Sequence, residues 1–478
     1  METMTGSEVA SRDYAVILEK QRKKAIELRN SSGRDRKKKL KKIRNWIFEH
    51  KDDIREALYN DYQKPAAETD LSESYVVISE IRHALRNLSQ WMKKEKVDTP
   101  LAMLGTRSHI QYEPKGTCLI IAPWNFPFNL MMGPLVSAIA AGNTAILKPS
   151  EMTPHTSDLM EGMISELFEE DEVAVVQGGI EVSQALLALK FDHIFFTGSP
   201  KVGKIIMEAA AKNLTSVTLE LGGKSPAIVD ETAAINDTAE KLVAGKYVNN
   251  GQTCIAPDYV MAHESIYTKL IEKIKEKTAK SYDPDGKGIE QNSDYGRLVN
   301  ERHFKVINGM IEDAVSKGAK VEMGGKTTEA SNFVEPTLLS EVPENSTVLQ
   351  EEIFGPVLPI IPYTNLDEVI DRINAGEKPL ALYVYSRKKS HQDRILKSCS
   401  SGTACVNESV VHFLNHYLPF GGVNNSGIGK SHGYYGFLAF SNAKGVLKQR
   451  VGFTTAKLIG APYDRFTKFV IDTLLKYL

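Results

Sequence analysis

The sequence contains few cysteines, and neither its cysteines nor its histidines have the spacing of metal ligands. Four cysteines occur in 478 residues, with no C-x-x-C pair and no zinc-ligand spacing. The eleven histidines show no metal-ligand spacing either, so we predict no metal site. This cysteine usage is typical of a reducing compartment rather than of a disulfide-built secreted protein, and it predicts a cytoplasmic location.

The sequence also lacks long apolar runs and a large net charge. No run of about eighteen apolar residues occurs, so no transmembrane helix is expected. Residues 1–13 lack the apolar core of a signal peptide. The formal net charge is −1, which predicts no nucleic-acid partner. The basic cluster at residues 36–42 is interpreted as the solvated face of an amphipathic helix, because acidic residues follow and no aromatic residues are interleaved.

What the sequence does contain is a regular alternation of strand-like and helix-like segments. Short apolar runs predict buried strands at residues 118–122, 144–147, 174–176, 193–196 and 217–219. Helix-like stretches lie between them, at residues 134–141, 156–168 and 202–212. Strands that alternate with helices indicate βαβ units, so the predicted fold is α/β, with a doubly wound parallel sheet covered on both faces.

Further segments flank this region. A charged helical pattern covers residues 35–95. A second α/β pattern follows Cys254, with predicted helices near 267–280 and 301–317 and predicted strands at 319–323 and 357–361. The tail at 466–478 has an amphipathic helical pattern too short to span a bilayer. Packing on this chain or on a second subunit is the favoured interpretation of the tail, and weak membrane-surface association is the alternative.

Cys254 is the candidate nucleophile. It ends the segment Asn-Asn-Gly-Gln-Thr-Cys, residues 249–254, which places a thiol among small and amide residues. A cysteine acts as a nucleophile when its thiolate fraction is raised and the site is open. A lone cysteine more often packs as a small hydrophobe, so the assignment depends on the segments upstream. Cys118, Cys399 and Cys405 have no neighbouring base and are interpreted as structural.

Two further candidates for catalysis follow predicted strands. Asn125 lies in Pro-Trp-Asn-Phe-Pro, residues 123–127, where a rigidly held amide could donate to a developing oxyanion, an effect worth about 10²–10³ in rate. The alternative is a turn in which Asn125 caps the next helix. Glu220 follows the predicted strand at 217–219 and could act as a general base toward the thiol or a water, if burial raises its pKa. A helix cap or an ion pair with Lys224 is the alternative for Glu220.

Two other strand ends carry candidate cofactor groups. Lys148 and Glu151 follow a predicted strand and could both hydrogen-bond a ribose, because ligands bind at the carboxyl ends of parallel strands; a surface ion pair is the alternative. Residues 196–204, Phe-Thr-Gly-Ser-Pro-Lys-Val-Gly-Lys, place backbone N–H groups at a predicted helix start, where a pyrophosphate is favoured. Ile205 stands where a P-loop needs Ser or Thr, which excludes nucleoside triphosphate hydrolysis. Dinucleotide binding remains, with a plain strand-to-helix turn as the alternative.

The order of these motifs resembles that of the NAD(P)-dependent aldehyde dehydrogenase superfamily over nearly the whole chain. The resemblance rests on Pro-Trp-Asn-Phe-Pro, Lys-Pro-Ser-Glu, Phe-Thr-Gly-Ser, Glu-Leu-Gly-Gly-Lys-Ser-Pro, Gly-Gln-x-Cys, Glu-Glu-x-Phe-Gly-Pro and Pro-Phe-Gly-Gly, in this order. Residues 251–259 and 418–423 are most similar to the class 3 branch, which acts on fatty and aromatic aldehydes. Asn424 is a departure, because class 3 members usually have glycine there.

The resemblance implies a role for each motif. Cys254 would attack the aldehyde carbonyl, and the Asn125 side chain and the Cys254 backbone N–H would hold the oxyanion. Glu220 would activate the water that hydrolyses the resulting thioester. The cofactor would be NAD, with NADP as the weaker alternative, because a carboxylate at Glu151 repels a 2′-phosphate while Lys201 softens that preference. The implied cofactor-binding residues are Trp124, Lys148, Glu151, Gly198, Ser199, Val202, Gly203, Glu352 and Phe354.

The resemblance also implies a domain organisation and a homodimer. A Rossmann-like NAD(P)-binding domain would comprise residues 1–95 and 116–221, and an α/β catalytic domain residues 222–425. A β-hairpin at 96–115 with a closing strand at 440–452 would form an oligomerisation element, followed by a tail helix at 453–478. The substrate would be a small-molecule aldehyde, medium- or long-chain aliphatic or aromatic. His412 and His416 could line its entrance, or lie on the surface.

Two alternatives to simple aldehyde oxidation are considered. A coenzyme A-acylating dehydrogenase would pass the thioester to a thiol, but Glu220 argues against this because hydrolysis is what needs a water-activating base. A non-catalytic NAD-binding or structural protein would need none of the nucleophile, oxyanion donor and base that this sequence retains.

Overall fold

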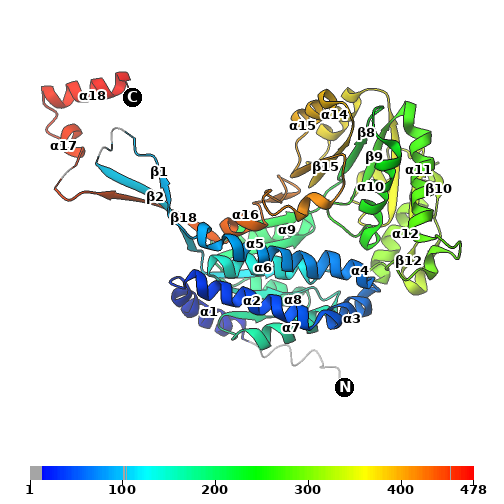
Figure 1. The fold of residues 1–478 in the computed structure, drawn as a ribbon, viewed down its shortest axis with the longest axis horizontal. Coiled ribbons are helices and arrows are strands. Elements are labelled where there is room, and N and C mark those ends of the chain that lie inside the picture. Colours follow the sequence, from blue (N-terminus) through cyan, green and yellow to red (C-terminus); the bar gives the residue numbers. More distant parts are fainter. Residues whose placement is uncertain (1–12, 101–102, 104, 453, 478) are drawn as a thin grey trace.

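The computed structural model describes residues 13–100, 103, 105–452 and 454–477. The expectation about a signal peptide falls mostly on residues 1–12, which lie outside the described residues, as do 101, 102 and 104 of the predicted hairpin and residues 453 and 478 of the predicted tail. The described chain forms two largely parallel sheets with their helices, and a three-stranded element that projects from them (Figure 1).

The first sheet contains the five strands predicted between residues 118 and 219. Its strands are β3 (Thr117–Ile121), β4 (Thr144–Lys148), β5 (Val173–Val175), β6 (His193–Gly198), β7 (Ser216–Leu221) and the short β17 (Gly427–Ile428). Their order is β17-β7-β6-β3-β4-β5, and only β17 is antiparallel. The chain runs outward from β3 to β5 and returns to β6 on the other side of β3. The predicted doubly wound fold is therefore confirmed, with a topological switch point between β3 and β6.

Helices cover both faces of this sheet. They are α1 (Tyr14–Leu28), α2 (Gly33–Glu49), α3 (Lys51–Tyr62), α4 (Ala66–Thr69), the π-helical η2 (Asp70–Ser74), α5 (Tyr75–Trp91), α6 (Asn129–Ala141), α7 (Pro154–Leu167), α8 (Ile180–Leu187), α9 (Pro200–Ala211) and α16 (Gly433–Ala439). Because side chains alternate along a strand, Cys118 and Ile120 of β3 join the core with α2, α5 and α6, whereas Leu119 and Ile121 join the core with α1, α8 and α9.

Helix α6 begins before the predicted start at Pro134. It starts at Asn129, so Pro134 lies inside the helix. A proline within a helix removes one backbone hydrogen bond. Nearly the whole of α6 is buried and apolar, so packing on α5 and on the sheet outweighs this loss.

The second sheet follows directly after the Gly222-Gly223 turn. Its strands are β8 (Pro226–Val229), β9 (Tyr259–His263), β10 (Lys320–Met323), β13 (Thr337–Ser340), β14 (Val357–Tyr363), β15 (Ala381–Tyr385) and β16 (Thr403–Val406). The order is β10-β13-β14-β9-β8-β15-β16, parallel except for β10. The predicted strands β10 and β14 are confirmed, whereas the other five were not predicted.

Helices and shorter elements complete this second layer. The helices are α10 (Ile235–Tyr247), α11 (Glu264–Tyr282), α12 (Glu301–Ser316), α13 (Thr347–Gln350), α14 (Leu366–Ala375) and α15 (Lys389–Ser398). The shorter elements are η4 (Val248–Gly251), η5 (Ile289–Gln291), η6 (Glu329–Ser331), η7 (Val411–Leu414), β11 (Thr327–Thr328) and β12 (Phe333–Val334). The helices predicted near 267–280 and 301–317 are confirmed as α11 and α12.

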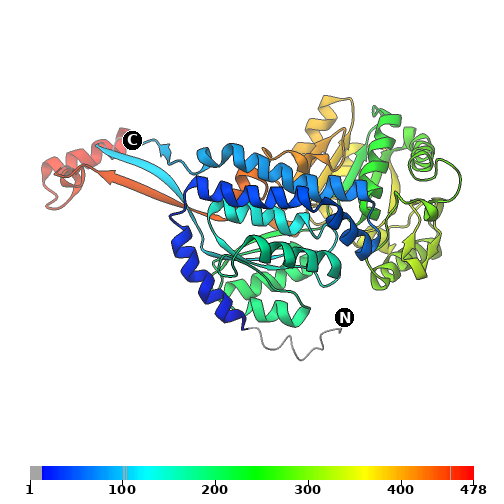
Figure 2. The same cartoon turned by 60° about the horizontal axis from the view of Figure 1, so that its bottom comes forward.

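The projecting element consists of β1 (Glu95–Val97), β2 (Thr106–Pro114) and β18 (Ser441–Gln449), in the order β1-β2-β18. Figures 1 and 2 show it extending away from both sheets, with α17 (Ala456–Ile459) and α18 (Arg465–Tyr477) near its far end. The predicted amphipathic tail helix is therefore present as α18, and its apolar residues Phe466 and Phe469 are exposed. Among the described residues, no helix is both long and apolar enough to cross a membrane.

Candidate active site

Cys254 lies in a loop that follows α10 and η4. Asn249 and Asn250 of η4 have φ values of 51° and 54°, in the left-handed region that asparagine tolerates better than most residues. Both side chains are buried, whereas Cys254 itself is only half-buried. The two left-handed residues turn the chain sharply out of α10, so that the thiol reaches the space between the two sheets.

Two adjoining cavities meet at Cys254 and Glu220. The larger cavity has a volume of about 240 Å³ and is lined by Pro123, Trp124, Asn125, Leu130, Thr197, Gly198, Ser199, Glu220, Gly222, Cys254, Glu352 and Phe354. The smaller cavity has a volume of about 50 Å³. Its lining residues are Val76, Glu80, Asn129, Leu130, Gly133, Pro134, Ser137, Phe195, Thr197, Glu220, Cys254, Leu380, Phe420, Ser431 and His432. The larger cavity thus brings together all three predicted catalytic residues and several of the predicted cofactor residues.

Four of the predicted cofactor residues lie outside this lining. Lys148 ends β4 and forms an ion pair with Glu151 at 2.8 Å, which was the alternative interpretation of that motif. Burial tends to raise the pKa of Glu151, but the hydrogen bond and the charge of Lys148, together with the backbone N–H of Glu151, outweigh it, so the pKa is lowered and the carboxyl group stays charged. Val202 and Gly203 belong to the first turn of α9, which Ser199 caps. A Cβ at Gly203 would approach the Leu221 side chain to 2.9 Å, so glycine lets α9 pack closely on β7.

Asn125 is fixed to the loop that carries Cys254. Its side-chain Nδ2 donates a hydrogen bond to the carbonyl of Gln252 at 2.9 Å. Its own carbonyl accepts hydrogen bonds from the Asn249 side chain at 2.8 Å and from the Tyr62 hydroxyl at 2.9 Å. The alternative in which Asn125 caps the next helix is wrong, because the N-cap position of α6 is Phe128. One amide hydrogen of Nδ2 stays free of this contact and is available to a ligand.

Glu220 is buried near the end of β7, beside the C-terminal segment that returns as β17. Its Oε1 accepts a hydrogen bond from the Ser431 hydroxyl at 2.8 Å, and its Oε2 has no hydrogen-bond partner among the described residues. Burial raises the pKa of Glu220 to about 8, although Ser431 and the Lys430 ammonium counteract part of this rise. The predicted alternative of an ion pair with Lys224 is wrong, because Lys224 pairs with Asp258.

The thiol of Cys254 is neutral in this arrangement. Burial, together with the negative charges of Glu352 and Glu220, raises its pKa to about 12. Burial and the neighbouring Asp258 raise the pKa of Glu352 to about 8. A Cβ at Gly222 would overlap the Glu352 carboxyl group, so the missing side chain at Gly222 makes room for that carboxyl in the larger cavity.

Several residues that support the site were not predicted. Gln252 is fully buried, donates to the carbonyls of Asn249 and Arg297, and accepts from the Val299 N–H. Ser431 reaches Glu220 across 211 positions of sequence. The sequence around Gln252 could have indicated its supporting role, because the amide oxygen and nitrogen of a buried glutamine both need hydrogen-bond partners. No feature of the sequence near Ser431 indicates its contact with Glu220.

The C-terminal segment differs from two expectations. The described lining of the two cavities includes neither His412 nor His416: His412 bonds the Thr403 hydroxyl at 2.9 Å, and His416 is buried beside Glu80. His432, which was not predicted, lines the smaller cavity instead. Asn424 has a φ of 55°, so it takes up the left-handed conformation that glycine would supply at this position.

Comparison with known proteins places the chain among relatives of one kind. It matches the Aldehyde dehydrogenase family over residues 2–446. It is 45% identical over 409 residues to the 4,4'-diaponeurosporen-aldehyde dehydrogenase of Staphylococcus aureus (strain NCTC 8325 / PS 47), with 86% of this chain and 88% of that protein covered. It is 42% identical over 411 residues to Aldehyde dehydrogenase family 3 member A2 of Macaca fascicularis, with 86% and 83% covered. Among solved structures, the substrate-bound state of Staphylococcus aureus AldH superposes with a TM-score of 0.92 at 40% identity, over 97% of this chain and 100% of that one.

Proposed function

Because the chain belongs to the aldehyde dehydrogenase family, whose members are enzymes that oxidise aldehydes, we propose that it converts an aldehyde to the carboxylic acid through a thioester on Cys254, with NAD as the oxidant. The observation that carries this proposal is the meeting of two cavities at Cys254 and Glu220. The larger cavity is suited to the nicotinamide half of the cofactor and the smaller one to the aldehyde. Four residues line both cavities, Leu130, Thr197, Glu220 and Cys254, and of these Cys254 offers the nucleophile and Glu220 the base.

The first step is attack by the Cys254 sulfur on the aldehyde carbonyl carbon. The thiol is neutral at pH 7, because its pKa is about 12, so its proton must leave as the sulfur–carbon bond forms. The carboxylate form of Glu220 is the nearby acceptor for that proton. The free hydrogen of Asn125 Nδ2 and the Cys254 backbone N–H donate to the oxyanion, and such fixed donors are worth roughly 10²–10³ in rate.

The second step is hydrolysis of the thioester. Glu220 Oε2 is buried and has no hydrogen-bond partner among the described residues, so it is available to accept a proton from water. A pKa of about 8 keeps part of the population ionised at neutral pH and makes the carboxylate a stronger base than an exposed glutamate. Glu220 first releases to solvent the proton that it took from the thiol. Water then attacks the acyl carbon, its proton passes to Glu220, and Cys254 leaves as the thiolate, which takes up a proton to restore the neutral thiol.

The residues of the larger cavity fit a dinucleotide. The Glu352 carboxyl, for which Gly222 leaves room, suits the hydroxyls of a ribose, and the capped start of α9 at Ser199 suits a pyrophosphate. Phe354 and Trp124 add aromatic walls, with ring centroids 5.4 Å apart. A bound oxidised nicotinamide would supply the acceptor for the hydride on the former aldehyde carbon once the Cys254 sulfur has added to it. We expect NAD to be preferred and NADP to be used less well, because the Glu151 carboxylate stays charged.

The substrate and the assembly follow from the walls of the smaller cavity and from the projecting element. Apolar atoms form most of the surface of those walls, which favours aliphatic or aromatic aldehydes of medium or greater length. We assign residues 1–95 and 116–221 to cofactor binding and 222–425 to catalysis. The projecting strands at 96–115 and 440–452 would pair with a second copy to form a homodimer, and the cysteine usage favours a cytoplasmic location.

The central test is replacement of the nucleophile. We expect Cys254→Ala to abolish NADH formation while NAD still binds, because the cofactor contacts lie on other residues. NADH absorbance measures turnover, and quenching of protein fluorescence measures NAD binding. Acid should form without coenzyme A in the unmodified enzyme, which separates hydrolysis from acyl transfer. Turnover that survives in Cys254→Ala would refute the mechanism.

A further inference from the structure

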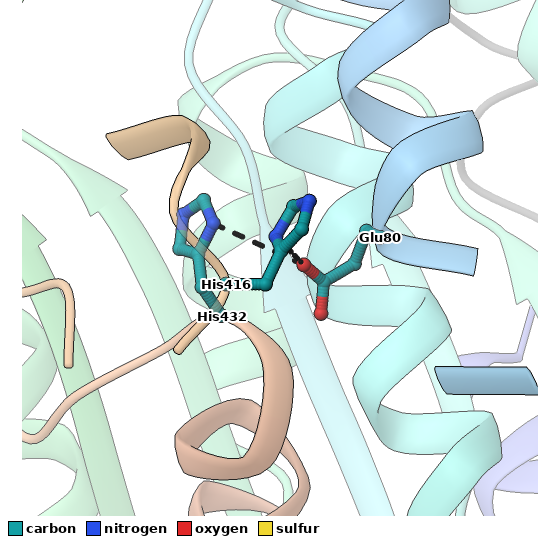
Figure 3. A group of neighbouring side chains, drawn as sticks. All are labelled: Glu80, His416 and His432. Carbon is teal, nitrogen blue, oxygen red and sulfur yellow. Dashed lines mark ion pairs between the residues drawn. The ribbon is translucent and has the colours of Figure 1, made fainter. Parts of the chain in front are cut away.

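We infer that Glu80, His416 and His432 form a binding site for a divalent metal ion of the zinc class, beside the smaller cavity. Figure 3 shows the three side chains converging from separate parts of the fold. Glu80 lies in the middle of α5, His416 follows η7, and His432 is the N-cap residue of α16. The site goes beyond the proposed oxidation of aldehydes, which requires no metal.

The three ligand atoms lie close to the spacing that one ion requires. His416 Nδ1 is 2.8 Å and His432 Nδ1 is 4.0 Å from the same carboxylate oxygen, Glu80 Oε2. All three atoms lie within 4.8 Å of one another. Two atoms bound to the same tetrahedral zinc are roughly 3.3 Å apart, since each bond is about 2.0–2.2 Å long. Side-chain adjustments of about 1 Å would therefore seat the ion.

The closest contact is an ion pair that lacks hydrogen-bond geometry, between His416 Nδ1 and Glu80 Oε2 at 2.8 Å. Although His416 Nδ1 and Glu80 Oε2 are near each other, neither atom has a hydrogen-bond partner of acceptable geometry within the described chain. Both side chains are more than nine-tenths buried, with relative exposures of 8% and 5%. Buried polar atoms without partners are costly and call for an explanation such as a missing ion. A cation between the two atoms would satisfy both of them.

The surrounding contacts hold the ligands with these atoms facing inward. His416 Nε2 hydrogen-bonds the Ser79 hydroxyl at 2.8 Å, which fixes the ring with Nδ1 toward Glu80. The other carboxylate oxygen, Glu80 Oε1, accepts the Gly433 backbone N–H at 2.7 Å. Metal-ligating histidines and carboxylates are typically oriented by outer contacts of this kind, through the atom that does not bind the metal.

The ligand set identifies the class of ion and the consequence of binding. Two imidazoles and one carboxylate, without thiolate, suit Zn²⁺ with an open fourth position. Glu80 and His432 line the smaller cavity together with Cys254, so the fourth ligand would come from that cavity. A bound ion would reduce the space for the aldehyde. We therefore expect Zn²⁺ to inhibit competitively with the aldehyde and not with NAD.

A second group of similar composition serves as a control. His391 Nδ1 lies 3.0 Å from Asp230 Oδ2, where the two make a hydrogen bond, and 3.9 Å from Glu231 Oε1. The other Asp230 oxygen accepts from the Thr232 N–H and hydroxyl. Hydrogen bonds within this group thus already satisfy the close contacts, so we assign it no metal.

The test is a titration with Co²⁺, whose visible absorption reports its ligands, on full-length protein carrying Cys254→Ser to remove the nucleophilic sulfur beside the site. We expect one cobalt per chain, displaced by Zn²⁺, with d–d absorption and no sulfur-to-cobalt charge transfer. His432→Ala and Glu80→Gln should each weaken binding by more than about tenfold, whereas His391→Ala should not. Glu80→Gln retains an oxygen for the Gly433 N–H, so it should fold even if His432→Ala does not.

Enzyme with Cys254 intact provides the functional readout. Zn²⁺ inhibition should be competitive with the aldehyde and should weaken by more than about tenfold in Glu80→Gln, while His391→Ala responds like the unmodified enzyme. Absence of cobalt binding, binding that persists in Glu80→Gln, or a sulfur-to-cobalt band would each overturn the site.

Discussion

Ser431→Ala removes the one side-chain hydrogen bond that the described residues make to the proposed general base. The Ser431 hydroxyl donates to Glu220 Oε1 at 2.8 Å in a buried setting, and it lowers a pKa that burial raises to about 8. A hydrogen bond to a charged group contributes roughly 1.5–3 kcal/mol, and one pH unit corresponds to about 1.36 kcal/mol. Loss of this bond should therefore raise the pKa of Glu220 by roughly one to two pH units.

The sign of the effect on activity follows from which form of Glu220 is the base. Only the carboxylate accepts a proton, so activity is present above its pKa and is lost as the pH falls through it. At pH 7 about one Glu220 in ten is ionised when the pKa is about 8. Ser431→Ala should then lower the rate of thioester hydrolysis at pH 7 by about tenfold or more, and the rate should recover in alkaline solution.

Rapid-quench measurement of acyl-enzyme breakdown from pH 6 to 10 gives the profile directly. Ser426→Ala is the matched control, because the Ser426 hydroxyl lies in the same segment but, within the part of the chain that the structure describes, bonds to the backbone of Val423 alone, at 3.0 and 3.1 Å. Ser431→Thr retains a hydroxyl and should restore the original profile. If Ser431→Ala slows hydrolysis equally at every pH, the bond does not set the pKa of Glu220 and the reasoning fails.

Three further predictions concern the other proposed roles. Asn125→Ala should lower kcat by about 10²–10³ with little change in KM, as steady-state NADH formation would show, and a change in KM alone would contradict an oxyanion role. Glu220→Gln should give a burst of NADH followed by slow turnover, with an acyl group on Cys254 detected by intact-protein mass spectrometry; a burst-free trace without acyl-enzyme would contradict its role as base. Glu151→Gln should raise the ratio of kcat/KM for NADP over NAD by about fivefold, because it removes one charge near the 2′-phosphate; an unchanged ratio would place Glu151 away from the adenine ribose.

The first sheet could be predicted because its strands are continuous apolar runs. A parallel strand buried on both faces needs apolar side chains at every position, as in β3, where all five residues are buried. The second sheet was predicted only in part for the opposite reason. β8 has four residues and begins with Pro226, and β16 is only partly buried, so neither gives a strong pattern.

The candidate catalytic residues could be found because parallel strands deliver them to one edge of the sheet. Asn125 and Glu220 were singled out as strand ends, and the larger cavity contains both. What surrounds these residues could not be found in this way. The two left-handed asparagines before Cys254, and the fixing of Asn125 by Gln252, depend on contacts between loops that are distant in sequence.

The chemistry of Glu220 is the clearest case of such dependence, because a separate segment supplies its surroundings. β17 pairs with β7 so that Gly427 lies opposite Glu220, and this pairing brings Lys430 and Ser431 to the carboxyl group. The C-terminal segment passes close to the carboxyl group of Glu220, because a Cβ at Gly421 would come within 3.1 Å of Glu220 Oε1 and 2.7 Å of the Gly429 carbonyl. The pKa of the base is therefore set by how tightly the C-terminal segment closes on the first sheet. A substitution that loosens this closure should change the pH dependence of thioester hydrolysis while leaving the neutral thiol of Cys254, on the opposite loop, largely as it was.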